Sequence, residues 1–81
     1  MKLFKKTYKI MEVYSSTGSC IYYVHLTRKG FEKLIDWVRG AEEVGSYERF
    51  GKEGVCITIN HFKVPCMAEF HEIIDKVLEQ C

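Results

Sequence analysis

The sequence predicts a small α+β domain with the element order β-β-α-β-β-α. In this fold a four-stranded, mainly antiparallel sheet carries two helices on one face. Two observations lead to this prediction. Two pairs of strand-like segments are each joined by a turn, and each pair is followed by a segment with helical periodicity. The 81 residues are predicted to form a single domain over residues 1–81, because a chain of this length supports one hydrophobic core.

The first hairpin is predicted from residues 7–26. Residues 7–14 (TYKIMEVY) alternate loosely between apolar and polar side chains and are rich in aromatic and β-branched residues, which favour strands. Residues 15–18 (SSTG) have the composition of a turn. The strand pattern then resumes at residues 20–26 (CIYYVHL).

The first helix is predicted to follow Thr27, a residue type that commonly caps helix N-termini. Its apolar residues recur at the spacing of one helix face, and they are Phe31, Leu34, Ile35 and Val38. Gly40 is expected to end the helix in the left-handed conformation that glycine tolerates.

The second half repeats this order. Residues 46–50 and 55–59 are predicted strands joined by a turn at residues 51–54, and Pro65 suits the first turn of a second helix. The apolar stripe of that helix consists of Met67, Phe70, Ile73, Ile74, Val77 and Leu78.

A sequence similarity suggests an internal repeat. Residues 18–26 (GSCIYYVHL) resemble residues 54–62 (GVCITINHF), thirty-six positions later. One interpretation is a pseudo-twofold pair of ββα units, at about residues 7–40 and 46–81. The alternative is a chance match, since strands and helices draw on few residue types. The predicted element order does not depend on this choice.

Composition limits the class of protein. The chain is 47% hydrophobic and 28% charged, with a net charge of +1, which is typical of a folded soluble domain. The longest apolar run, residues 20–24, is too short to cross a membrane, and the amino terminus lacks a signal-peptide core. We therefore expect a cytoplasmic protein whose four cysteines are reduced.

The histidines and cysteines predict neither a metal site nor a cofactor site. Each histidine follows a cysteine by five positions, but residues five apart do not share one side of a strand or helix. Cys66 is the candidate nucleophile of a thiol enzyme, because it precedes a helix N-terminus and His61 is a nearby base. Without an orienting residue or oxyanion hole, the sequence favours a packing role for Cys66 and a protein that is not an enzyme.

Charge is distributed unevenly along the chain. Residues 1–40 carry a balance of +5 and residues 41–81 a balance of −4. Four acidic residues of the second helix recur at spacings of three or four and form an acidic ridge: Glu69, Glu72, Asp75 and Glu79. The ridge is either a solvated helix face or a docking surface for a protein partner with a basic surface.

The first hairpin suggests single-stranded nucleic-acid binding as an alternative function. Its candidate residues are lysines that hold phosphates and tyrosines that stack on bases, namely Lys5, Lys6, Lys9, Tyr8 and Tyr22. Because the net charge is close to zero and the second half is acidic, nucleic acid is the less favoured partner.

The sheet is predicted to have one uncovered face. If Ile57 faces the helices, alternation turns Cys56 away from them, and the matching residues of the first hairpin are Cys20, Tyr22 and Val24. An apolar face of this kind is typical of a binding surface, here for a homodimer. Trp37, at the side of the first helix's apolar stripe, is a second candidate anchor.

Together these features predict a small, non-catalytic, intracellular protein-binding module. Its role would be that of an adaptor or an inhibitor, such as the phage and mobile-element inhibitors of nucleic-acid-handling host proteins; this comparison is an analogy of size and surface. The alternatives are single-stranded nucleic-acid binding and a thiol enzyme using Cys66.

Overall fold

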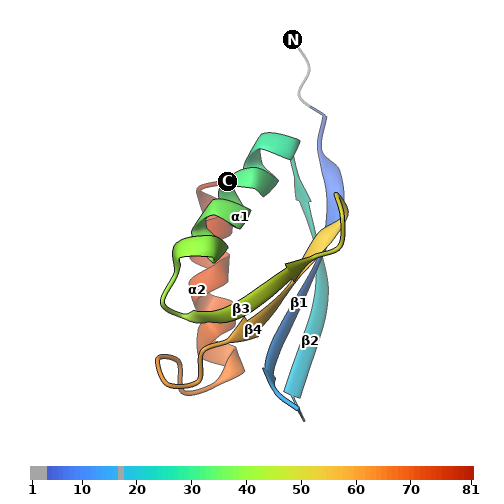
Figure 1. The fold of residues 1–81 in the computed structure, drawn as a ribbon. Coiled ribbons are helices and arrows are strands. Elements are labelled where there is room, and N and C mark those ends of the chain that lie inside the picture. The colour runs from blue at the N-terminus through green and yellow to red at the C-terminus, as the bar shows by residue number, and fades with distance from the viewer. Residues whose placement is uncertain (1–3, 17) are drawn as a thin grey trace.

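The computed structural model describes residues 4–16 and 18–81 and contains the predicted order of elements. Figure 1 shows two hairpins, each followed by a helix. The elements are β1 (Lys6–Ser15), β2 (Gly18–Leu26), α1 (Arg28–Gly40), β3 (Val44–Arg49), β4 (Gly54–Ile59) and α2 (Met67–Glu79).

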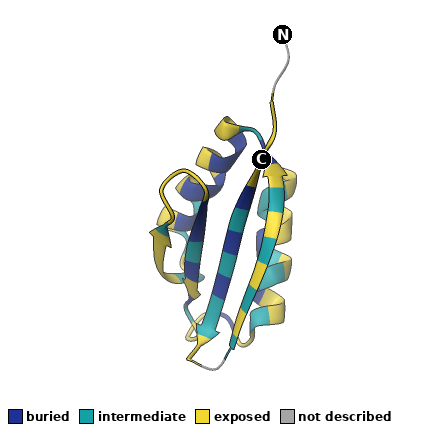
Figure 2. Ribbon diagram, turned by 90° about the vertical axis from the view of Figure 1, so that its right-hand side faces the viewer, coloured by how far each residue is buried: buried dark blue, intermediate teal, exposed yellow. Residues whose placement is uncertain are grey.

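The four strands form one mixed sheet in the order β2-β1-β4-β3. The two hairpins pair internally in antiparallel fashion, while the central strands β1 and β4 are parallel. Both helices cover the same face of the sheet, and the other face is left uncovered (Figures 1 and 2). The predicted fold class, a mainly antiparallel sheet with two helices on one face, is confirmed.

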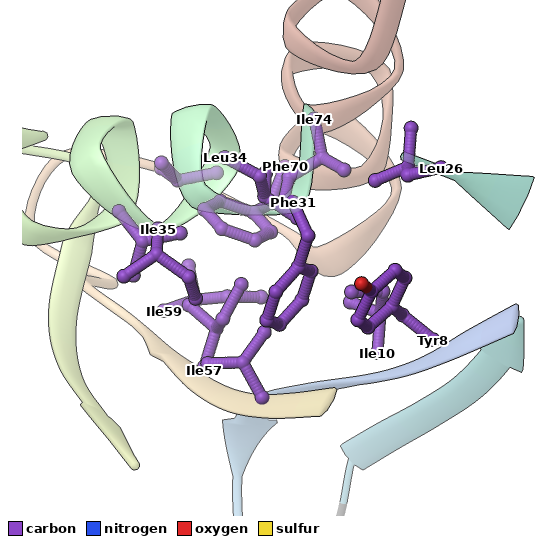
Figure 3. Close-up of a cluster of buried hydrophobic side chains, with 13 residues drawn as sticks. Tyr8, Ile10, Leu26, Phe31, Leu34, Ile35, Ile57, Ile59, Phe70 and Ile74 are labelled. Carbon is purple, nitrogen blue, oxygen red and sulfur yellow. The ribbon is translucent and has the colours of Figure 1, made fainter. Parts of the chain in front are cut away.

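The hydrophobic core lies between the sheet and the helices (Figure 3). Alternate residues of the central strands point into it, because side chains of a strand alternate between faces. The residues predicted for the α1 stripe are all buried there, as are Phe70 and Ile74 of α2. Each such side chain contributes about 1.5–3 kcal/mol by leaving water, so this interface fixes both helices against the sheet.

The helix termini differ in detail from the sequence prediction. Thr27 caps α1 as predicted, since its Oγ1 accepts a hydrogen bond from the Gly30 amide at 3.0 Å. Gly40, however, lies within α1 and has no positive φ, and the helix ends instead in an extended Ala41. Pro65 lies before α2 and not in its first turn, because the N-cap residue is Cys66.

The internal repeat is not confirmed. A twofold axis would place equivalent strands, either β1 with β3 or β2 with β4, at the centre of the sheet. The central pair is instead β1 with β4, the first strand of one hairpin and the second strand of the other. The similar segments at residues 18–26 and 54–62 therefore contain strands with different positions in the sheet: β2 lies at the edge and β4 at the centre.

Candidate functional site

The uncovered face of the sheet is built by the residues that alternate with the core. In the register of β1, Met11 lies opposite Ile21 on one side and Cys56 on the other. Figure 2 views this face, with the helices behind the sheet. Its apolar side chains lie mainly on β1, β2 and β4 and in the residue after β3, and they include Met11, Val13, Ile21, Tyr23, Phe50 and Cys56.

The prediction that Cys20, Tyr22 and Val24 belong to this face is wrong. They pair with alternate β1 residues that face the helices, among them the buried Tyr8. The register of the first hairpin decides this point, and it depends on how the turn at residues 15–18 closes. Ile21, on the opposite side of β2, takes their place on the uncovered face.

The uncovered face carries little charge and is mixed in polarity. Thr7, Ser19, His25, Ser46 and Thr58 alternate onto it beside the apolar side chains. Ile21 and Tyr23 expose 48% and 64% of their surface, which is unusual for large apolar residues that are neighbours on one strand. Among the described strand residues that alternate onto this face, Lys9 and Glu48 are the charged ones, and they have opposite signs. Apolar surface of this kind is typical of protein interaction sites.

The acidic ridge is exposed as predicted. Glu69, Glu72, Asp75 and Glu79 are all exposed on α2, and the helix buries Phe70 and Ile74 on its other side. Because α2 covers the helical face of the sheet (Figure 1), the ridge and the uncovered face belong to opposite sides of the molecule.

Trp37 is half-buried in α1. Its ring lies 6.4 Å from that of Phe70, between ring centroids, and it borders a shallow hollow beside Val77. The contact with Phe70 makes Trp37 part of the helix–helix packing, with one side open to solvent.

A buried polar pair, which the sequence analysis missed, lies between the sheet and α2. The side chain of Glu12 is fully buried, at 0% exposure. Both of its carboxylate oxygens are close to Nδ1 of His71, at 2.9 and 3.1 Å. His71 Nε2 is 3.7 Å from Asp75 on the next turn of α2. The sequence did contain one indication of this pair. Strand alternation places Glu12 on the same side of β1 as Tyr8 and Ile10, which is the side that faces the core.

Tyr22 completes this polar cluster. Its ring packs edge-on against His71, with centroids 4.7 Å apart, and its hydroxyl is buried without a hydrogen-bond partner of good geometry among the described residues. Burial, and then the nearby Glu12 carboxylate, raise the pKa of the Tyr22 hydroxyl. A hollow of about 330 Å³ beside the cluster is lined by Glu12, Cys20 and His71, with two residues of α2.

In this cluster the imidazole of His71 is oriented by a carboxylate, and Cys20 is the thiol that shares its hollow. His71 Nδ1 is held by Glu12, and no hydrogen bond joins Cys20 to His71 in the described part of the chain. Cys66 is exposed at the N-cap of α2, and the described residues show no hydrogen bond between its thiol and His61. The ring of His61 lies near that of Phe62 instead.

The described residues contain no group of three or more potential metal ligands. The four cysteines are free thiols. Among the described helices, none is long and apolar enough to cross a membrane.

The tyrosines of the predicted nucleic-acid site are not available for base stacking. Tyr8 is only 3% exposed and stacks on Phe31 in the core, and Tyr22 lies under α2. The three lysines of that prediction, Lys5, Lys6 and Lys9, remain at the surface. The predicted lysines are therefore accessible at the beginning of β1, but the predicted tyrosines are not accessible for stacking.

Comparison with known proteins finds no matching family model, no similar curated protein and no similar solved structure. The geometry defines a small α+β domain with two exposed surfaces, one partly apolar and nearly uncharged and the other acidic.

Proposed function

We propose that this protein is a non-catalytic protein-binding module that acts as an adaptor or inhibitor. The uncovered face of the sheet packs against a second copy of the chain, and the acidic ridge of α2 binds a partner protein with a basic surface. The observation that carries this proposal is the nearly uncharged, partly exposed row formed by Ile21, Met11 and Cys56.

Self-association is favoured by the chemistry of this face. Two copies that meet face to face bring apolar side chains together, which is the main source of binding free energy. The two charged residues of the face, Lys9 and Glu48, have opposite signs, so a twofold arrangement can pair them across the interface. The acidic ridge then points outward from both copies and is free to bind another protein.

The dimer is tested by light scattering coupled to size exclusion over a range of concentrations. We expect the wild-type chain to form a dimer and the double variant Ile21→Ser, Tyr23→Ser to be monomeric. Phe62→Ser is the matched control, since Phe62 is 88% exposed in the loop after β4 and outside the face. A wild-type chain that is monomeric at all concentrations refutes the dimer.

The ridge is tested separately by reversing the charge at Glu69, Glu72 and Asp75. Affinity capture with quantitative mass spectrometry should show a partner that the wild type and the Ile21→Ser, Tyr23→Ser variant retain and the charge-reversed variant loses. Capture that survives charge reversal would show that the ridge is only a solvated helix face.

A further inference from the structure

A basic hollow of about 560 Å³ lies at the end of the molecule where β1 begins. Figure 1 shows the beginning of β1, the first turn of α1 and the turn between β3 and β4 together at this end. Four cationic side chains line the hollow, against one carboxylate. They are Lys6 of β1, Arg28 of α1, Arg49 of β3 and Lys52 of the turn, and the carboxylate is Glu32.

Most of this positive charge is not neutralised within the protein. Glu32 pairs with Arg49 at 3.1 Å. Among the described residues, no carboxylate lies within ion-pair distance of Lys6, Arg28 or Lys52. Four like charges gathered around one cavity repel each other, so an anion that enters the hollow relieves this repulsion.

Arg49 also has an unused hydrogen-bond donor. Its Nε is buried and has no acceptor among the described residues. The guanidinium lies over the ring of Phe31, 5.6 Å from its centroid, and the Glu32 contact further limits its movement. The guanidinium is therefore held at the wall of the hollow, and the exposed part of the Arg49 side chain, 32% of its surface, is the part that an anion can reach.

Aromatic surface accompanies the cations. Phe4 lines the hollow and is 82% exposed, so its ring is available for stacking. A second hollow, of about 470 Å³, shares Lys6 with the first. It continues toward the uncovered face and is lined by Thr7, by Lys9 and the carboxylate of Glu53, and by the exposed rings of Tyr23 and Phe50.

We propose that the basic hollow is a nucleotide-binding site, in which the four cations hold a phosphate and Phe4 stacks on the base. Arginine and lysine are the usual phosphate ligands, and an aromatic ring stacks on any base. A free nucleotide and the end of a single strand present the same chemistry to this site.

Four probes at low ionic strength distinguish the ligands: inorganic phosphate, pyrophosphate, adenosine 5′-monophosphate and a labelled single strand of about eight nucleotides, a length within the range of known single-strand sites. We expect saturable binding of the nucleotide or the strand that weakens as salt is added. If the strand binds more tightly than the nucleotide, the ligand of the site is a single strand. If the two affinities are equal, the ligand is a free nucleotide.

The double variant Arg28→Glu, Lys52→Glu should weaken binding about tenfold or more, because it reverses two of the cations that contact phosphate. The control, Lys63→Glu with Lys76→Glu, makes the same change in net charge at exposed positions outside the hollow and should have little effect. Circular dichroism verifies that both variants fold.

Two further variants test the ligand contacts. Phe4→Ala should weaken binding of the nucleotide by roughly 5- to 100-fold, the range expected for loss of one stacking partner, and leave pyrophosphate unaffected. Arg49→Lys, which keeps the charge and removes the planar guanidinium, should weaken binding of every phosphate probe.

Three results would overturn the proposal. The first is the absence of saturable binding at about 100 µM protein, which lies at the weak end of non-specific nucleic-acid affinities. The second is equal loss of affinity in the hollow and control variants, which would mean that only net charge matters. The third is nucleotide binding that is no tighter than pyrophosphate binding and unchanged by Phe4→Ala, since the site would then hold an anion alone.

Discussion

Replacement of His71 by leucine tests the role of the buried pair between β1 and α2. Glu12 has no exposed surface, so water cannot replace the imidazole of His71 as the hydrogen-bond partner of its carboxylate. A change that leaves a buried carboxylate without its partner typically costs about 3–5 kcal/mol, and we expect His71→Leu to lower the free energy of unfolding by this amount.

Replacement of Glu12, the other partner of the pair, should lower the free energy of unfolding by a smaller amount. Glu12→Gln leaves an amide that can still hydrogen-bond to His71, and the His71 side chain is 37% exposed, so water can solvate it. The expected cost is about 1.5–3 kcal/mol, the range for a hydrogen bond to a charged group. The double variant Glu12→Leu, His71→Leu replaces the pair by apolar side chains and should recover to within about 1 kcal/mol of the wild type.

Urea unfolding at pH 7, followed by circular dichroism and by the fluorescence of Trp37, measures these differences. His61→Leu is the control, because His61 is exposed and has no carboxylate partner among the described residues; its effect should stay within about 0.5 kcal/mol. The reasoning is refuted if His71→Leu costs no more than Glu12→Gln, or if the double variant is less stable than His71→Leu.

Three other measurements follow from the structure. Because the pKa of Tyr22 is raised in the folded protein, its contribution to the free energy of unfolding is fully present below the ordinary value of 10.0 and is lost as the pH rises above that value. Urea midpoints measured at increasing pH should therefore fall less steeply in Tyr22→Phe than in the wild type. A Cβ on Gly54 would overlap a backbone carbonyl of β1, so Gly54→Ala should lower the free energy of unfolding by about 3 kcal/mol. The control is Gly40→Ala, which has open space around it and should be neutral or slightly stabilising. Alkylation kinetics followed by mass spectrometry should find Cys66, which is exposed, reacting before Cys56, because burial and then Glu48 raise the pKa of the Cys56 thiol; equal rates would contradict this order.

The order of elements was predictable because each element has a local cause. The α1 stripe repeats with helical spacing, and Thr27 caps the helix through a contact three residues away. The alternation of Val55, Ile57 and Ile59 predicts the inner side of β4, and all three residues are buried. The exposure of the acidic ridge follows in the same way from the spacing of charged residues on α2.

The composition of the candidate sites depended on contacts between distant segments. The register of β1 with β2 turned Tyr22 and Val24 inward and placed Ile21 and Tyr23 on the uncovered face, a result that one residue of slippage would reverse. Glu12 and His71 are 59 positions apart, so no local pattern links them. The basic hollow likewise gathers Lys6, Arg28, Arg49 and Lys52 from four segments of the chain.

The sequence by itself thus determined the secondary structure and its order, since periodicity, capping and turn chemistry act between neighbouring residues. Only the tertiary structure decided which side chains share a surface. The reason is physical: strand order and register are selected by burial of the whole core, and that selection places β1 beside β4 and brings the cations of both halves to one end of the sheet.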